Sequence, residues 1–315
     1  MKKRFLLIFF LPVVALAQPE PSIPRDTSYT VRSTYQKLIK DYPDIEAVEP
    51  KLPEGVTHQS KVYHNVGGRT LHADVFYPTQ KKPTGYPGIL LIHGGGWRAG
   101  DRSLMIPLAQ QLAAQGYVTV AAEYRLSLEA QYPAAVHDLK AALRWMRSQT
   151  KDFSLDTSQI AVLGCSAGGQ LSALIGTTNG LAKLEGKKTL GDFSSDVQAI
   201  IDIDGVLAFK HPESEEGVVA AQWLGGTYEE TPGTWTEASA LSHVNKNTPP
   251  VLFIASSFPR FHAGKGDMIN ILKQHDTYYE SYLLEGSPHS FWLFHPWFEP
   301  TLQYVTGFLN KVFQP

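Results

Sequence analysis

Hydrophobic residues change their spacing along the chain, and these changes divide the body of the sequence into strands and helices. From Val56 onward, apolar and polar residues alternate on both sides of Val66-Gly-Gly-Arg69, which predicts a β-hairpin. Short, mostly apolar runs then predict strands over 89–92, 117–122, 160–163, 197–204 and 250–255, and a last strand is expected over 278–284. Together with the two strands of the hairpin, these runs indicate an eight-stranded sheet.

Segments with helical spacing lie between the apolar runs. Helices are expected over 105–115, from Pro133 to about Met146, after the glycine-rich turn at 164–169, and over 267–273 and 304–312. Because strands alternate with helices, the predicted fold class is α/β, with a mostly parallel sheet and helices on both faces. Active sites in such sheets lie beyond the C-terminal ends of the strands, so candidate chemistry is sought there.

The segment 205–249, between the sixth and seventh predicted strands, is too long for a plain crossover. It is predicted to form a cap insertion over the active edge of the sheet. The cap contains the aromatic residues Trp223, Tyr228 and Trp235. These side chains either stack on sugar rings or form a small core of the cap itself, and the sequence favours neither interpretation.

The first residues have the pattern of an export signal. A basic start at Lys2-Lys-Arg4 precedes an apolar stretch over 5–14, and Ala15-Leu-Ala17 fits a cleavage site. The apolar stretch is too short to span a bilayer. Residues 1–17 are therefore predicted to be a signal peptide, with a mature chain that starts near Gln18 and is periplasmic or secreted. Residues 18–55 are predicted to be a strap with a short helix over 35–40, and 56–315 a single catalytic domain.

Composition excludes several classes of partner. With 18% charged residues, 43% hydrophobic residues and a formal net charge of -2, the 315-residue chain resembles an ordinary globular protein. This charge balance predicts neither a nucleic-acid partner nor a membrane partner after signal cleavage. The one cysteine, Cys165, cannot form an intramolecular disulfide and is interpreted as a small buried side chain.

The strand over 160–163 runs into Gly164-Cys-Ser-Ala-Gly168, which is followed by a predicted helix. A G-x-S-x-G motif between a strand and a helix is typical of a nucleophile elbow. In such an elbow the serine occupies a strained turn, so its neighbours two before and two after must be small. Ser166 is therefore the candidate nucleophile, at a helix N-terminus whose dipole favours developing negative charge.

A second glycine motif, His93-Gly-Gly-Gly-Trp97, follows the strand over 89–92. Together with 164–169, it resembles the α/β-hydrolase superfamily, and within it the branch of hormone-sensitive-lipase-like, carbohydrate and feruloyl esterases. The resemblance implies that the N–H groups of Gly95, Gly96 and Ala167 form the oxyanion hole, the arrangement that stabilises the tetrahedral intermediate of acyl transfer. Trp97, beside this motif, is taken as a substrate-binding candidate.

The serine needs a base, and in this superfamily the order along the chain is Ser, acid, His. The family carries its histidine after the last strand, where this chain has Gly286-Ser-Pro-His289. His289 is therefore the predicted base, and His295 is its competitor.

The acid departs from the family pattern, which usually places an aspartate a few residues past the seventh strand. The corresponding segment here, 256–262, contains no acidic residue. Asp204, at the end of the sixth strand, is the favoured replacement, and Asp267, on the helix after the seventh strand, is the alternative. A serine–histidine dyad is the third possibility. Asp202 faces the same side of its strand as Asp204 but lies deeper.

Arg260 and His262 occupy the loop where the acid was expected. Arginine suits carboxylate recognition, so both residues are substrate-binding candidates. The competing interpretation of Arg260, a structural salt bridge to Asp267 or Glu215, is the one favoured by the sequence.

These features predict a secreted serine esterase that removes small acyl groups, notably acetyl, from plant cell-wall polysaccharide or oligosaccharide. No cofactor is required, and the histidines lack metal-site spacing such as H-E-x-x-H. The alternatives are a feruloyl esterase, a general carboxylesterase or lipase-like enzyme, and a hydrolase-fold protein that binds sugar without turnover.

Overall fold

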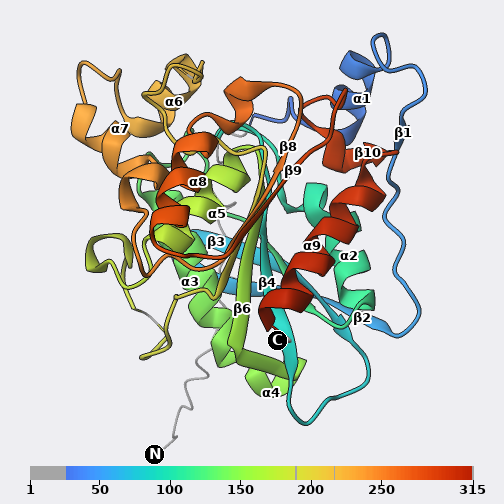
Figure 1. Cartoon of the computed structure of the whole chain (residues 1–315). Coiled ribbons are helices and arrows are strands. Elements are labelled where there is room, and N and C mark those ends of the chain that lie inside the picture. Colours follow the sequence, from blue (N-terminus) through green and yellow to red (C-terminus); the bar gives the residue numbers. More distant parts are fainter. Residues whose placement is uncertain (1–25, 189, 216, 314–315) are drawn as a thin grey trace, which may run out of the picture.

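A computed structural model describes residues 26–188, 190–215 and 217–313. The predicted leader, residues 1–17, lies outside these ranges and stays a prediction. Within them, a mostly parallel eight-stranded sheet forms the centre of the molecule (Figure 1). In chain order its strands are β2 (Val56–Val66), β3 (Arg69–Pro78), β4 (Tyr86–Ile92), β5 (Val118–Ala122), β6 (Leu155–Cys165), β7 (Ala199–Ile203), β8 (Val251–Ala255) and β9 (Tyr279–Leu283).

The strands are arranged in the order β2-β3-β5-β4-β6-β7-β8-β9. The β2–β3 hairpin and the β3–β5 pair are antiparallel, and every later pair is parallel. The predicted α/β class, strand number and largely parallel pairing are therefore confirmed. The C-terminal ends of β4, β6, β7 and β8 meet at one edge of the sheet, where the two glycine motifs lie.

Helices cover both faces of the sheet. In chain order they are α1 (Val31–Leu38), α2 (Ile106–Ala114), α3 (Ala134–Ser148), α4 (Thr150–Phe153), α5 (Ala167–Thr177), α6 (Gly217–Leu224), α7 (Pro232–Ala238), α8 (Lys265–Gln274) and α9 (Phe298–Phe313). Figure 1 shows α2 and α9 on one side of the sheet and α3, α5 and α8 on the other.

Side-chain alternation along the central strands supplies both layers of the core. Along β4, Leu90 and Ile92 belong to the core beneath α3 and α5, whereas Ile89 and Leu91 belong to the core beneath α2 and α9. All four side chains are fully buried. A strand that is apolar on both faces is what a sheet covered by helices on both sides requires, which explains the continuous apolar runs.

The N-terminal strap packs against the body through two elements. Helix α1 starts at Val31 because Thr30 and Ser33 form a reciprocal capping box. The predicted helix, 35–40, was therefore placed a turn too late. The strand β1 (Glu46–Ala47) pairs with β10 (Phe294–His295), a two-stranded sheet that hydrophobic spacing does not predict. The Tyr29 hydroxyl also lies 3.3 Å from Ser290 Oγ, so the strap touches the residue that follows His289.

The segment between β7 and β8 carries α6, α7 and the 3₁₀ turn η3 (Ala240–His243), and it projects above one end of the sheet (Figure 1). Trp223 and Trp235 are buried in it, whereas Tyr228 is half-buried. The Trp223 ring is stacked on Trp97 at 5.1 Å between centroids. Of the two interpretations of the cap aromatics, the tryptophans therefore fit a core of the cap, and Tyr228 alone of the three keeps substantial exposed surface.

Candidate active site

Ser166 lies in a sharp turn between β6 and α5. Its backbone has φ 56° and ψ -123°, a region that side chains rarely adopt and that functional sites often contain. A side chain at either elbow glycine would clash, because a Cβ on Gly164 would lie 1.8 Å from the carbonyl oxygen of Gly168. A Cβ on Gly168 would lie 2.1 Å from the carbonyl oxygen of Ile92. The two glycines thus allow the turn that lifts the Ser166 hydroxyl to the edge of the sheet.

Three predicted site residues come together at this edge. His289 Nε2 lies 2.8 Å from Ser166 Oγ, and His289 Nδ1 lies 2.7 Å from Asp204 Oδ2. Both distances fall within hydrogen-bonding range for a nucleophile–base–acid arrangement. His289 retains limited exposure, whereas the Asp204 side chain is fully buried.

Asp204 directly follows β7 and is held by a second contact. Its backbone has φ 54°, a left-handed conformation that aspartate adopts more readily than most residues. The other carboxylate oxygen, Oδ1, accepts a hydrogen bond of 2.9 Å from the backbone N–H of Ser256. Ser256 begins the loop after β8, where the family pattern would place the acid. The loop therefore still contacts the acid, but through its backbone.

The competing residues lie elsewhere. Asp267 is on α8 with an exposed side chain, and its carboxylate lies 3.2 Å from His211 Nε2. His295 is in β10 and pairs with Glu299 at 2.7 Å. The structure therefore brings Asp204, rather than Asp267, to His289, and His289, rather than His295, to Ser166.

Phe261, which sequence reasoning did not single out, stacks on the imidazole of His289. The ring centroids are 3.4 Å apart and the planes differ by 11°. The Trp292 ring stands perpendicular to the same imidazole, with the ring centroids 5.4 Å apart. The two aromatic rings restrict rotation of His289 about its side-chain bonds. The aromatic loop over 256–262 is the only sequence signal that pointed to such a contact.

Arg260 and His262 flank Phe261 in the 3₁₀ turn η4 (Pro259–His262). The Arg260 guanidinium lies 4.3 Å from the Phe261 centroid and forms a 2.9 Å salt bridge with Glu215 of the cap segment. The favoured structural interpretation of Arg260, including Glu215 as a partner, thus has a matching contact. His262 Nε2 is buried and makes no hydrogen bond within the described residues. Burial, with a smaller effect of nearby Lys265, lowers the pKa of His262, so the neutral imidazole is favoured.

The glycine motif after β4 lies against the nucleophile. A Cβ on Gly94 would lie 2.9 Å from Ser166 Cβ, so a larger residue would displace the serine. Gly96 and Ala167 line a small cavity of about 20 Å³ beside Ser166. Gly95 turns the loop at φ 124°, and its carbonyl oxygen accepts hydrogen bonds from Arg98 and Ala99.

Trp97 closes the same small cavity, but its indole is almost fully buried. Its Nε1–H donates a 2.9 Å hydrogen bond to Gln170 Oε1, and Gln170 Nε2 donates at 2.8 Å to the carbonyl oxygen of Ala238. Gln170 lies one turn after Ser166 in α5, so one buried amide joins the glycine motif, the nucleophile helix and the cap. Trp97 therefore contributes to the arrangement of the loop through these contacts.

Two further buried groups lie under the site. Burial, and then repulsion from Asp204, raises the pKa of Asp202 well above the usual value of a carboxyl. Asp202 Oδ1 accepts a 2.9 Å hydrogen bond from the N–H of Gly205. Burial likewise raises the pKa of the Cys165 thiol, which disfavours the reactive thiolate. Cys165 is fully buried, as its interpretation as a small core side chain requires.

Within residues 26–188, 190–215 and 217–313, histidine, cysteine, aspartate and glutamate side chains form no group of three or more that could hold a metal ion. Across the same ranges, no helix has the length and apolar character needed to cross a membrane.

Comparison with solved structures identifies the fold. A truncated carbohydrate esterase from gut microbiota is 23% identical, with a TM-score of 0.68 over 84% of this chain and all of that chain. Esterase 2 of Thermogutta terrifontis, phosphonylated by sarin, is also 23% identical, with a TM-score of 0.71 over 84% of this chain and 96% of that chain. At this identity the likeness establishes the fold, which is that of the α/β-hydrolases.

Curated relatives are more similar in sequence over shorter stretches. Esterase LipC of Mycobacterium tuberculosis is 32% identical over 177 residues, which are 54% of this chain and 44% of LipC. Arylacetamide deacetylase of Oryctolagus cuniculus is 30% identical over 152 residues, which are 47% of this chain and 37% of the relative. The matches thus span less than half of the length of either relative.

Residues 73–258 match the family model described as BD-FAE. This range contains both glycine motifs, the nucleophile elbow and the segment between β7 and β8. The resemblance to α/β-hydrolase esterases is therefore confirmed. Because the family model matches more than half of the 315-residue chain, the chain belongs to the BD-FAE family.

Proposed function

We propose that the protein is a serine carboxylic ester hydrolase. The single observation that carries the proposal is the hydrogen-bonded series Ser166–His289–Asp204, with distances of 2.8 and 2.7 Å. The three residues follow the order Ser, acid, His along the chain, as in α/β-hydrolases. Relatives described as esterases support the same activity.

In the proposed mechanism, Ser166 Oγ attacks the carbonyl carbon of the ester while His289 Nε2 takes its proton. Asp204 holds the imidazole in the tautomer with the proton on Nδ1 and stabilises the imidazolium. Backbone N–H groups of the glycine motif and of Ala167 stabilise the oxyanion. His289 then protonates the leaving alcohol. Water, activated by His289, attacks the acyl-enzyme and releases the acid.

The space beside Ser166 favours a small acyl group. The cavity there measures about 20 Å³, which is room for about one water molecule, or for the methyl group of an acetyl ester. Val206 and Phe261 limit its size. An aromatic acyl group such as feruloyl would need these side chains to move. We therefore favour acetyl as the acyl group that the enzyme removes.

The wider proposal is that the enzyme is exported and deacetylates plant cell-wall polysaccharide or oligosaccharide. It draws on the leader-like sequence over 1–17 and on a structural neighbour described as a carbohydrate esterase. A feruloyl esterase or a general carboxylesterase is the alternative within the same chemistry. A sugar-binding protein without turnover is the alternative in a different class, and it would leave the hydrogen-bonded triad without a role.

The test is hydrolysis of p-nitrophenyl acetate by the wild type and by Ser166→Ala, with and without a serine-reactive inhibitor. Turnover that both the substitution and the inhibitor abolish would support the esterase, and absence of turnover would favour the binding protein. Acetate release from acetylated xylan, pectin and mannan, compared with release of ferulate from methyl ferulate, then distinguishes the substrate classes.

A further inference from the structure

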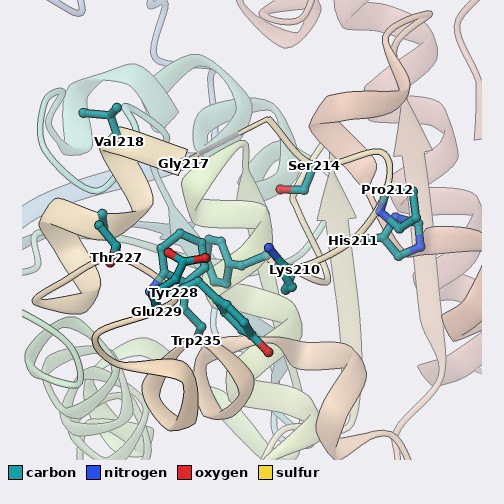
Figure 2. A pocket seen from close by; sticks show the side chains of 12 residues that line it. Lys210, His211, Pro212, Ser214, Gly217, Val218, Thr227, Tyr228, Glu229 and Trp235 are labelled. Atoms are coloured by element: carbon teal, nitrogen blue, oxygen red, sulfur yellow. The ribbon is translucent and has the colours of Figure 1, made fainter.

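A second cavity, of about 860 Å³, opens within the cap. Its walls come from the segment between β7 and α6, from α6, and from the segment that leads into α7 (Figure 2). This volume falls within the range of about 300–1,000 Å³ that is typical of small-molecule sites. It is far larger than the cavity beside Ser166, so the molecule has space for much more than an acyl group.

Fixed aromatic rings form one wall of the cap cavity. Tyr228 and Phe209 each meet Trp235 in an edge-to-face arrangement. The centroid of Trp235 lies 6.1 Å from that of Tyr228 and 6.0 Å from that of Phe209. The Trp235 Nε1–H donates a 3.0 Å hydrogen bond to the carbonyl oxygen of Gly226, which fixes the indole. Figure 2 shows Tyr228 and Trp235 together on this wall. Flat apolar surfaces of this kind suit the C–H face of a sugar ring as well as other apolar groups.

Polar groups in the same cavity distinguish among these ligands. Ser214 lines the cavity, and its Oγ is buried with no hydrogen-bond partner in the described part of the chain. An unpaired buried hydroxyl is unfavourable, and a ligand group can pair with this one only if the Ser214 side chain turns into the cavity. A purely apolar ligand, such as a lipid chain, would leave this hydroxyl unpaired.

Charges in the cavity are mixed. Lys210 lies with its ammonium 4.6 Å from the Tyr228 ring centroid, and no carboxylate among the described residues forms a salt bridge with it. Glu229 adds an exposed carboxylate to the same lining (Figure 2). A cation and an anion together favour a neutral ligand with several hydroxyl groups, because hydroxyls can accept from lysine and donate to glutamate.

The cap cavity adjoins the catalytic site through a thin wall. Val219 follows Val218, which lines the cap cavity, and it packs closely over Gly96 of the glycine motif. A Cβ added to Gly96 would lie 3.0 Å from Val219 Cγ1. The Phe209 ring, which lines the cap cavity, lies 5.2 Å from Trp97, which lines the small cavity beside Ser166. The two cavities are therefore neighbours, separated by the packed side chains of Phe209 and Trp97.

We propose that the cap cavity is a carbohydrate subsite that binds neutral glycosyl units on the alcohol side of the scissile ester. Tyr228 provides the stacking surface, while Ser214, Lys210 and Glu229 bind ring hydroxyls. This inference rests on the proposed esterase function and adds to it the location of the sugar and the residues that select it. The small acyl cavity and the large cap cavity thus divide the substrate into an acetyl part and a saccharide part.

The first test compares Tyr228→Ala with Tyr278→Ala, a matched loss of a tyrosine that lies outside the cavity. The measured quantity is kcat/KM on acetylated xylo-oligosaccharides divided by kcat/KM on p-nitrophenyl acetate. Tyr228→Ala should lower this ratio about tenfold, the effect expected for one lost aromatic contact. Tyr278→Ala should leave the ratio unchanged. Acetylated manno-oligosaccharides and pectic oligosaccharides are measured in the same way, and one of the three series must respond.

The second test measures binding without turnover. Calorimetry with Ser166→Ala protein and the same acetylated oligosaccharides gives Kd. Adding Tyr228→Ala to this protein should weaken binding about tenfold, and adding Ser214→Ala should weaken it a few-fold. Ser214→Ala should do so without lowering Tm, because the lost hydroxyl has no partner in the described structure. A purely structural serine would instead lower Tm.

The outcomes separate this inference from the proposed function. If the wild type shows no Ser166-dependent turnover, the esterase proposal fails, whereas the binding measurement still tests the cavity. If turnover is present but neither the ratio nor Kd responds to Tyr228→Ala, the subsite is refuted. A Tyr228→Ala variant that lost activity selectively on methyl ferulate would also refute the subsite, because the cap cavity would then bind the acyl part of the ester.

Discussion

Replacing Asp204 with asparagine tests the triad most directly, because the backbone around it determines how the new amide must lie. Asp204 Oδ1 accepts from the N–H of Ser256 at 2.9 Å, and Oδ2 faces His289 Nδ1 at 2.7 Å. In Asp204→Asn, the amide oxygen must face the Ser256 N–H, since the opposite orientation would bring two donors together. The NH₂ group then faces His289 and donates to Nδ1.

This orientation of the amide reverses the tautomer of His289. With Nδ1 acting as acceptor, the neutral imidazole carries its proton on Nε2, the atom that must take the proton of Ser166. An equivalent change in a serine–histidine–aspartate triad lowers kcat about 10⁴-fold, or ~5.4 kcal/mol in activation free energy. Asparagine is also among the residues that tolerate the φ of 54° at this position, so the loss should come with little backbone strain.

The assay is kcat for p-nitrophenyl acetate, with Tm as the check on folding. Asp202→Asn is the matched control, since it alters a buried carboxyl two residues earlier that does not contact His289. Asp267→Asn is the control for the alternative acid, whose side chain is exposed and pairs with His211. Both controls should stay within about threefold of the wild type. An Asp204→Asn variant that kept more than a tenth of the activity, or a large loss in Asp267→Asn, would refute the reasoning.

Four further predictions follow from the same contacts. Ser166→Ala should lower turnover of p-nitrophenyl acetate by about 10³-fold or more with Tm nearly unchanged, and residual activity above a tenth would contradict its role as nucleophile. Phe261→Leu should lower kcat more than it raises KM, because the stack that fixes His289 is lost; a pure KM effect would assign Phe261 to substrate binding alone. The Tm of Asp202→Asn should increase relative to that of the wild type as pH rises from about 4. Burial raises the pKa of Asp202 in the folded state, so the wild type loses stability as pH rises from the ordinary carboxyl pKa through this raised pKa, whereas the amide of the variant cannot ionise. A Tm difference that is constant between pH 5 and 9 would count against it. Mass spectrometry of exported protein should find a mature N-terminus near Gln18, and a retained stretch over 5–14 would indicate an anchor instead.

Most of the fold could be predicted because hydrophobic spacing reports burial directly. The six strands predicted after the hairpin correspond to β4 through β9. The apolar runs of β4 through β8 are buried, whereas β9, at the edge of the sheet, is only partly buried. The β1–β10 pair could not be predicted in this way. It joins two-residue segments about 250 positions apart in the sequence, and its pairing is set by where the strap lies on the finished body.

The site was predictable where backbone geometry constrains residue type. Gly164 and Gly168 must lack side chains for the elbow to form, so the motif itself shows the nucleophile. Phe261 was missed because stacking on His289 requires a three-dimensional approach of two loops, for which an aromatic residue in a loop is a weak signal. The roles of Ser214 and Gln170 are similarly invisible, since burial of a polar side chain leaves no trace in the spacing of apolar residues.

The position of the acid accounts for the contacts that the loop after β8 makes. An aspartate after β8 would approach His289 from that loop, whereas Asp204 approaches from the end of β7, the neighbouring strand in the sheet. The vacated loop keeps its contact with the acid through the Ser256 N–H and places Phe261 over the imidazole. Since Arg260 in the same turn pairs with Glu215 of the cap, the loop also joins the catalytic histidine to the cap segment. With the carboxylate at the end of β7, the histidine keeps an acidic hydrogen-bond partner, and the loop after β8 contributes Phe261 to the wall of the small cavity beside Ser166.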